Sequence, residues 1–355
     1  MTVSVTWPQV LAWRLGRQFV ARPGGDAVSI VRRLCGVQSQ VASSARLAVA
    51  VRQERPDPGE VESALWQDGT LAKTWLMRGT LHLVPADELP VYFGTLGSLR
   101  FWEKGSWQRG HGVTAAEIEK VIDAVPRALA GRVLTREELV ESVIEVTGDE
   151  HLREALTSGW GALLKPLSFL GELCYGPPRE GRVTFTSPGV APLPAAEAGT
   201  LLARAFLGAH GPATPEMFDA WLFRGQSRKA VLRAWFAGLG SDAVEIDVEG
   251  WPMLALAEHV DSLAATRPSE SVHLLPGFDQ YVLAAPRDLE PLLPAAVRAK
   301  VSRTAGWISP VVVYRGRIAG VWEAKSGKLA FELFEDVPAG PLADEADRVS
   351  ALLEP

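Results

Sequence analysis

The sequence predicts a helix-rich α+β fold with three tandem winged-helix motifs and a small C-terminal β-rich region. Three times along the 355 residues, two or three short helical patterns are followed by a pair of strands. Helices followed by a hairpin are the order of a winged helix, in which the third helix is the recognition helix and the hairpin is the wing. Proline- and glycine-rich breaks interrupt the pattern at 55–59, 187–194 and 266–268. We therefore divide the chain into the segments 1–110, 111–190, 191–262 and 263–355.

The first repeat is expected to hold four helices and one hairpin. Apolar periodicity predicts helices near 7–20, 26–35, 43–53 and 59–68, and Ser43 or Ser44 is expected to cap the third of them. Apolar strands are predicted at 73–77 and 80–84, on either side of a turn at Arg78-Gly79.

The next two repeats begin with clear helix-start signals. Thr114–Glu117 and Thr135–Glu138 have capping-box spacing, and Thr214-Pro215 is an N-cap followed by proline at the first helical position. The remaining helices are expected near 151–165 (ending before Pro166), 196–209 and 226–237, and strand pairs within 171–185 and 244–256.

The C-terminal segment is expected to be rich in β-structure between residues 272 and 335. A strand is predicted at 272–278 and a hairpin at 309–322 that turns at Arg315-Gly316, before a closing helix near 343–353.

The composition predicts a folded cytoplasmic protein. Hydrophobic residues make up 47% and charged residues 22% of the chain, and no apolar run is long enough to cross a membrane. The N-terminus lacks the pattern of a secretory leader. The only cysteines, Cys35 and Cys174, have no nearby cysteine or histidine, so we expect no disulfide, no metal site and no cofactor.

Positive charge is concentrated at the N-terminus of an acidic chain. The net charge is −6, yet residues 1–55 contain eight arginines, no lysine and only two carboxylates, Asp26 and Glu54. A basic face of this kind is what a surface that meets phosphate groups needs. Ordinary surface arginines on helices explain the same numbers equally well.

Two glutamines one residue apart, Gln38 and Gln40, are expected in the turn between the helices at 26–35 and 43–53. Their amides do not ionise, so neither is a general base, but together they can hold a water molecule from two sides. Taken alone, such a pair more often bonds to the backbone of a turn.

Several sequence blocks together resemble the AlkZ/YcaQ family of bacterial winged-helix DNA glycosylases. The blocks follow the family's order over most of the chain, and the 73–85 block, which contains Trp-Leu-Met-Arg-Gly-Thr-Leu-His, is specific. With glutamine at both ends of the motif, the chain resembles the Gln-x-Gln, AlkZ-type branch, although Ser39 replaces a residue that is commonly apolar. The matching blocks are 36–40, 73–85, 211–215, 275–279 and 309–322.

The resemblance implies a C-shaped enzyme that cradles double-stranded DNA, excises N7-alkylated purines and unhooks interstrand crosslinks. No lysine is a persuasive Schiff-base nucleophile, so we expect a monofunctional enzyme without lyase activity. Members of this branch are linked to self-resistance against the crosslinking natural product azinomycin B. It also implies that Gln38 and Gln40 are catalytic. Further residues are assigned to DNA or lesion binding: Arg33, Arg46, Trp75, Met77, Arg78, His82, Arg315 and Arg317. Trp75 and Met77 also fit a core, and His82 also fits a structural hydrogen-bonding role.

We expect a monomer that binds DNA containing alkylated or crosslinked purines and does not bind membranes. Two other readings stay open at this stage. One is a winged-helix transcriptional regulator without catalysis, which would need sequence-specific binding. The other is a protein-binding scaffold, which would lack the steep salt dependence of arginine–phosphate contacts.

Overall fold

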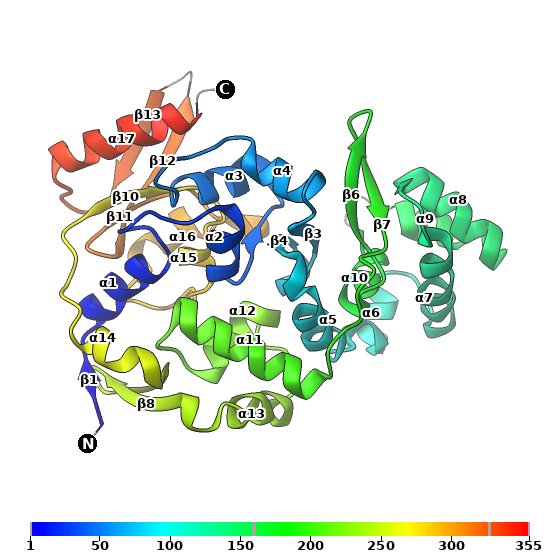
Figure 1. Ribbon diagram of the computed structural model, residues 1–355, viewed down its shortest axis with the longest axis horizontal. Coiled ribbons are helices and arrows are strands. Elements are labelled where there is room, and N and C mark those ends of the chain that lie inside the picture. The colour runs from blue at the N-terminus through cyan, green and yellow to red at the C-terminus, as the bar shows by residue number, and fades with distance from the viewer. Residues whose placement is uncertain (1, 158–160, 326–327, 354–355) are drawn as a thin grey trace. The chain divides into compact units, whose positions relative to one another are not determined.

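The computed structural model describes residues 2–157, 161–325 and 328–353 (Figure 1). The chain forms two compact units. The first combines residues 1–61 with 203–355, and the second spans 62–202. The helix-rich α+β class is confirmed. The division into four segments stays a prediction. None of the described helices is both long and apolar enough to span a membrane.

The N-terminal part of the first unit is a set of short helices with two brief strands between them. Thr6 and Asp26 cap α1 and α2 through their side-chain oxygens. The expected cap of α3 is wrong: Val41 precedes it without a side-chain bond, and Ser43 and Ser44 lie inside the helix. The elements are β1 (Ser4–Val5), α1 (Trp7–Arg17), α2 (Ala27–Arg33), β2 (Val37–Gln38), α3 (Ala42–Ala50) and α4 (Glu60–Trp66).

The order α2, β2, α3, α4, β3, β4 along the chain repeats the winged-helix order that the sequence predicts. The second unit begins with α4's last residues and the hairpin of β3 (Leu71–Trp75) and β4 (Leu81–Pro85), followed by α5 (Leu89–Gly97) and α6 (Gly105–Gly110). The strands pair antiparallel, with Thr74 opposite His82.

The second unit also contains the second repeat. Both predicted capping boxes are present, at Thr114 and Thr135. The three-stranded sheet has the order β5-β7-β6, in which the long β6–β7 hairpin of Figure 1 is the wing. Its elements are α7 (Ala115–Leu129), β5 (Leu134–Thr135), α8 (Arg136–Thr147), α9 (Leu152–Thr157), α10 (Leu164–Leu170), β6 (Cys174–Arg179) and β7 (Arg182–Thr186).

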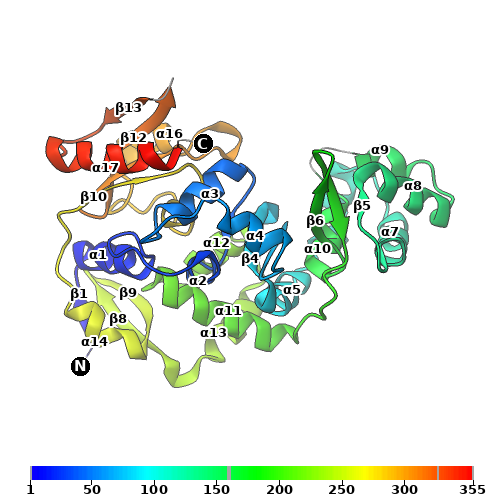
Figure 2. The same cartoon turned by 45° about the horizontal axis from the view of Figure 1, so that its top comes forward.

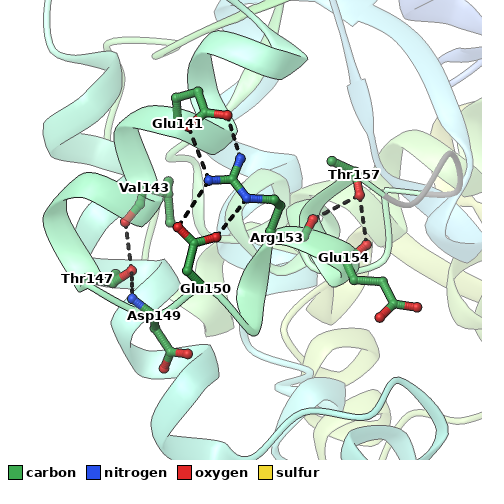
Figure 3. Close-up of polar contacts among 8 residues, drawn as sticks. All are labelled: Glu141, Val143, Thr147, Asp149, Glu150, Arg153, Glu154 and Thr157. Atoms are coloured by element: carbon green, nitrogen blue, oxygen red, sulfur yellow. Dashed lines mark hydrogen bonds and ion pairs between the residues drawn. The ribbon is translucent and has the colours of Figure 1, made fainter.

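One helix boundary in this repeat differs from the prediction. The helix expected at 151–165 ends at Thr157, and α10 continues through Pro166. Pro166 is the third residue of α10, where a backbone N–H has no partner within the helix, so proline costs little there. The part of the predicted helix at 158–160 lies outside the described residues. Figure 3 shows α9 tied to α8 and to the loop between them through Arg153, which pairs with Glu141 and Glu150.

The third repeat returns to the first unit at Ala203, within its first helix. Thr214 caps α12 through its hydroxyl, with Pro215 at the first helical position, as predicted. Ala213 bridges to Leu254 in the hairpin, and β1 adds to the other edge of that sheet in the order β1-β8-β9. The elements are α11 (Ala195–His210), α12 (Pro215–Phe223), α13 (Lys229–Ala237), β8 (Ala243–Val248), β9 (Trp251–Leu256) and α14 (Val260–Ala264).

The C-terminal part is a four-stranded antiparallel sheet, in the order β10-β11-β12-β13, with α17 beside it (Figures 1 and 2). The buried Glu345 of α17 accepts a hydrogen bond from the N–H of Leu274 in β10. The predicted turn at Arg315-Gly316 joins β11 to β12. The elements are β10 (Val272–Leu275), α15 (Gln280–Leu283), α16 (Arg298–Val301), β11 (Val311–Tyr314), β12 (Arg317–Lys325), β13 (Lys328–Leu333) and α17 (Ala339–Leu353).

Candidate active site

Gln38 and Gln40 lie in the short connection between α2 and α3, as the sequence predicts. Gln38 is the last residue of β2 and is only 5% exposed, whereas Gln40 is exposed. Because neither amide ionises, both carbonyl oxygens can accept hydrogen bonds at any physiological pH. The connection therefore offers one acceptor packed within the protein and one that a ligand can reach.

Ser39, between the two glutamines, is buried. Among the described residues its hydroxyl has no hydrogen-bond partner. An unsatisfied buried hydroxyl costs about 1–3 kcal/mol, which an apolar side chain in the same space would not. The Ser39 hydroxyl therefore supplies no hydrogen bond to a described residue that would hold the motif.

The far end of α3 is held by a buried ion pair. Arg52 Nη1 and Nη2 each donate to one carboxylate oxygen of Asp279 at 2.7 Å, and both side chains are fully buried. Arg52 also donates to the backbone carbonyls of Gln18, after α1, and of Ala48, within α3. One guanidinium therefore joins α1, α3 and the segment before α15, which fixes the helix that follows the two glutamines.

The hairpin of the specific sequence block belongs to the second unit. Arg78 lies at its turn in the left-handed region (φ 57°) and is half-buried, and the N–H of Leu76 donates to the carbonyl of Thr80 across the loop. Trp75 is buried with its ring 5.1 Å from that of Tyr175, and Met77 is fully buried. The placement of Trp75 and Met77 matches the core role; their contact with a lesion stays a prediction.

His82 is a buried neutral histidine on β4. Its Nδ1 lies 2.9 Å from the carbonyl oxygen of Thr80, so Nδ1 carries the hydrogen and donates it. Its Nε2 is buried and has no hydrogen-bond partner among the described residues. Burial, with a smaller effect of the Arg78 charge, lowers the pKa of His82 to about 3. His82 is therefore neutral near pH 7 and cannot act there as a cationic imidazolium acid.

Comparison with known proteins gives one consistent result. The family model described as DNA glycosylase AlkZ-like matches residues 31–354. The interstrand DNA cross-link repair glycosylase of Streptomyces sahachiroi is 44% identical over 349 residues, which cover 96% of this chain and 94% of that protein. The solved structure of the DNA glycosylase AlkZ from Streptomyces sahachiroi superposes with a TM-score of 0.94 at 43% identity, over 98% of this chain and 96% of that one.

The chain belongs to the AlkZ-like DNA glycosylase family. The resemblance drawn from the sequence is confirmed, and with it the glycosylase class of enzyme. The readings as a regulator without catalysis or as a scaffold are thereby set aside.

Fewer arginine side chains of the basic N-terminal segment are exposed than its composition suggests. Of its arginines, Arg14 and Arg52 are buried. Arg14 donates to the carbonyls of Gly211 and Pro212, and burial lowers its pKa to about 10. The arginines that are exposed are Arg22, Arg32, Arg46 and Arg55. The expectation of one arginine face is therefore corrected, because half of the eight arginines are wholly or partly buried and several of these bind backbone carbonyls.

The remaining arginines assigned to DNA differ in their surroundings. Arg33 is half-buried, stacks over Phe19 and donates to the carbonyl of Arg17. Arg46 is exposed on α3. Arg315 and Arg317 are exposed on either side of Gly316, and Arg315 is paired with Glu270 at 2.8 Å.

The hairpin tip between those two arginines is seated on the protein. Gly316 has a positive φ of 77°, and a Cβ there would lie 2.5 Å from Cβ of Leu11. Its carbonyl accepts a hydrogen bond of 2.7 Å from the hydroxyl of Tyr281. The tip is therefore anchored to α1 and α15, and only its two arginine side chains extend from it.

The structure places Gln38, Gln40, Arg33, Arg46, Arg315 and Arg317 in the first unit, and Trp75, Met77, Arg78 and His82 in the second. Within the first unit, the ion pair of Arg52 and Asp279 holds the end of α3 opposite the glutamine turn, and neither residue was among the predicted site residues. Asp279 ends the 275–279 block of the resemblance, but nothing in the sequence links it to an arginine 227 residues away.

The Asp279→Asn variant is expected to lose about 3–5 kcal/mol of unfolding free energy, because it leaves the Arg52 charge buried without its counter-ion. Urea-induced unfolding measures this. The control is Glu258→Gln, which removes the exposed pair with Arg204 and should change stability by less than about 1 kcal/mol. Equal effects of the two variants would contradict the supporting role given to Arg52 and Asp279.

His82 predicts an acid-sensitive fold. Its folded-state pKa is depressed, so its contribution to stability is complete above about 6.5 and falls as the pH drops toward about 3. Between pH 8 and pH 5 the wild type should lose on the order of 1–2 kcal/mol more than His82→Asn, which keeps a donor for Thr80 but does not titrate. The free energy of unfolding at both pH values tests this, and His151→Asn, which changes an exposed histidine, is the control. The same pH dependence in wild type and His82→Asn would refute it.

Proposed function

We propose that this protein hydrolyses the N-glycosidic bond of N7-alkylated purines in double-stranded DNA, and that it unhooks interstrand crosslinks formed through such purines. The observation that carries the proposal is the pair Gln38 and Gln40, held between α2 and α3 in a chain of the AlkZ-like family. The relative named as an interstrand DNA cross-link repair glycosylase supports the second part.

An N7-alkylated purine carries a positive charge and is already a good leaving group. When the bond between C1′ and N9 breaks, its electron pair moves onto the purine and neutralises that charge. The sugar is left with oxocarbenium character at C1′. Water then attacks C1′ and gives up a proton to solvent. The enzyme does not need to protonate the base; it must stabilise the sugar cation and position the water.

The carbonyl oxygens of Gln38 and Gln40 supply both of these functions. An amide oxygen carries partial negative charge, which stabilises a neighbouring cation, and it accepts a hydrogen bond from water. Packing around Gln38 restricts its amide, while the exposed Gln40 meets the substrate. An acceptor that is already in position needs little reorganisation during the reaction. This small reorganisation is the reason such groups stabilise a transition state better than water does.

The same chemistry accounts for crosslinks. Each alkylated end of a crosslink is a cationic purine, so cleavage of one glycosidic bond releases that purine from its strand. We extend the proposal to self-resistance against an azinomycin-like crosslinking compound. The protein is further expected to act as a monomer without a cofactor or lyase activity.

Replacing either glutamine with alanine should lower the single-turnover rate of 7-methylguanine release on the order of a hundredfold or more, since each removes a group that acts in the transition state. Duplex binding should stay within a few-fold of wild type, because an uncharged amide forms no ion pair with a phosphate, and ion pairs supply most of the affinity for duplex DNA. Base release from a methylated duplex and fluorescence anisotropy measure the two quantities. A crosslinked duplex in parallel reports unhooking.

Two results would overturn the proposal. Binding and excision that fall together would assign the glutamines to DNA binding, and full activity in both variants would remove them from the chemistry. The control is Gln226→Ala, which changes an exposed glutamine of the first unit after α12 and should leave both quantities unchanged.

A further inference from the structure

A small closed loop after α16 presents one tryptophan and one arginine to solvent. Its stem is an antiparallel bridge between Ser302 and Ile308. Within it, the N–H of Arg303 donates to the carbonyl of Trp307 at 2.8 Å, and the N–H of Trp307 donates to the carbonyl of Thr304 at 3.3 Å. Arg303 is exposed and Trp307 is 45% exposed. We call residues 303–307 the tryptophan loop.

The stem of this loop packs close to the glutamine turn. Gly277 lies between the two: a Cβ there would stand 2.9 Å from the carbonyl oxygen of Ile308 and 3.7 Å from Oγ of Ser44. Ser44 is the third residue of α3 and follows Gln40 by four positions. All of these residues belong to the first unit. The tryptophan loop therefore neighbours the first turn of the helix that begins directly after the two glutamines.

Trp307 rests on a strained aromatic residue. The ring of Phe278 meets it edge-on, with centroids 5.0 Å apart at 74°. Phe278 is buried and has a φ of 61°, a left-handed conformation that costs a bulky residue about 1–2 kcal/mol. The neighbouring Asp279, locked by Arg52, holds the backbone in place. An exposed indole that contacts a fixed ring loses little rotational freedom when something binds to it.

The charge around the loop favours DNA. Residues 291–322 include five cationic side chains and no carboxylate, in a chain of net charge −6. Three of the five are paired with carboxylates outside this range: Arg298 with Glu290, Lys300 with Glu332 and Arg315 with Glu270. The Arg303 side chain forms no ion pair or hydrogen bond with any described residue. An aromatic face beside an uncommitted cation is the combination by which proteins hold nucleotides, with stacking on the base and a contact to the phosphate.

We propose that the tryptophan loop is a DNA-binding element of this active site, in which Trp307 stacks on a nucleobase beside the lesion and Arg303 contacts a neighbouring phosphate. The inference rests on the glycosylase activity on DNA. A base becomes available for stacking where the helix is distorted around the purine to be released, since unstacking costs least at a damaged step. Trp307 is thus a binding residue, whereas Gln38 and Gln40 act on the bond.

Trp251 provides a matched control. It is 48% exposed and also meets a buried aromatic ring edge-on, that of Trp7, at 5.7 Å. It lies in the hairpin that carries Glu245, Asp247 and Glu249, whose negative charge disfavours DNA. Both tryptophans belong to the first unit, so general effects of removing an exposed indole should be the same for each.

The test compares Trp307→Ala, Trp307→Phe and Trp251→Ala on a duplex that contains 7-methylguanine beside a 2-aminopurine. Trp307→Ala should raise the enzyme concentration for half-maximal single-turnover rate about tenfold or more, the usual effect of losing one base–aromatic stack, with less change in the maximal rate. It should also lose the change in 2-aminopurine fluorescence on binding. Trp307→Phe should retain most of both, and Trp251→Ala should match wild type.

Arg303→Gln tests the phosphate contact separately. It should weaken binding a few-fold and reduce the slope of log affinity against log salt concentration by about one.

Each outcome is decisive. Trp307→Ala with wild-type half-maximal concentration and fluorescence would overturn the inference, and so would an equal loss in Trp251→Ala. If Trp307→Ala unfolds at a lower temperature than the wild type, Trp307→Phe and Trp307→Gln replace it in the test. A stacking role requires that the phenylalanine variant binds the duplex and the glutamine variant binds it weakly. Equal binding by the two variants would overturn the inference. If the wild type releases no base, the proposed substrate is contradicted and not the role of Trp307. The change in 2-aminopurine fluorescence on binding then still tests whether Trp307 stacks on a base.

Discussion

The arrangement of the first unit depends on the buried ion pair of Arg52 and Asp279. Arg52 is surrounded by the carbonyl of Gln18, the carbonyl of Ala48 and both carboxylate oxygens of Asp279. A buried charge is tolerated only when it is paired and hydrogen-bonded in this way. Separation of the three chain segments would leave the Arg52 charge without these partners, at a large cost in free energy. The pair links one end of α3 to the loop that contains Gly277 and Phe278. At the other end of α3 stand the two glutamines.

The chemistry that we propose for this protein needs no ionisable group. An alkylated purine brings its own positive charge, and two amides can stabilise the sugar cation without a proton transfer. His82, the histidine within the specific hairpin block, is neutral because burial lowers its pKa to about 3. In the proposed mechanism the rate depends on acceptors that are held rigidly, and the buried ion pair holds the far end of the helix that follows them.

Local signals in the sequence predicted local structure well. Thr114, Thr135 and Thr214 begin helices because their caps involve residues only three positions away. The turn at Arg315-Gly316 and the place of the glutamines between two helices were likewise predictable. A cap at Ser43 or Ser44 was wrong because α3 starts earlier, without a side-chain cap.

Features that depend on distant residues were not predictable. The burial of Arg14 depends on carbonyls 197 and 198 positions away, so the sequence alone counted it as surface charge. Trp307 and Phe278 meet only through the folding of two separated segments, and no short pattern marks them as a pair. The family was predictable because each of its specific blocks is one short, continuous stretch of sequence. The contacts that hold the helix after the glutamine motif come from residues far apart in the sequence.

The single-turnover rate of 7-methylguanine release by Gln40→Glu, measured across pH, tests most directly whether the glutamines act as oxygen acceptors. Glutamate keeps the shape and an oxygen acceptor but removes the amide donor. Because Gln40 is exposed, its carboxylate should titrate near the ordinary value of about 4.3. An acceptor role predicts that above about pH 6, where the carboxylate is ionised and both of its oxygens accept hydrogen bonds, the variant keeps most of the wild-type rate. A variant as inactive as Gln40→Ala at every pH would contradict it.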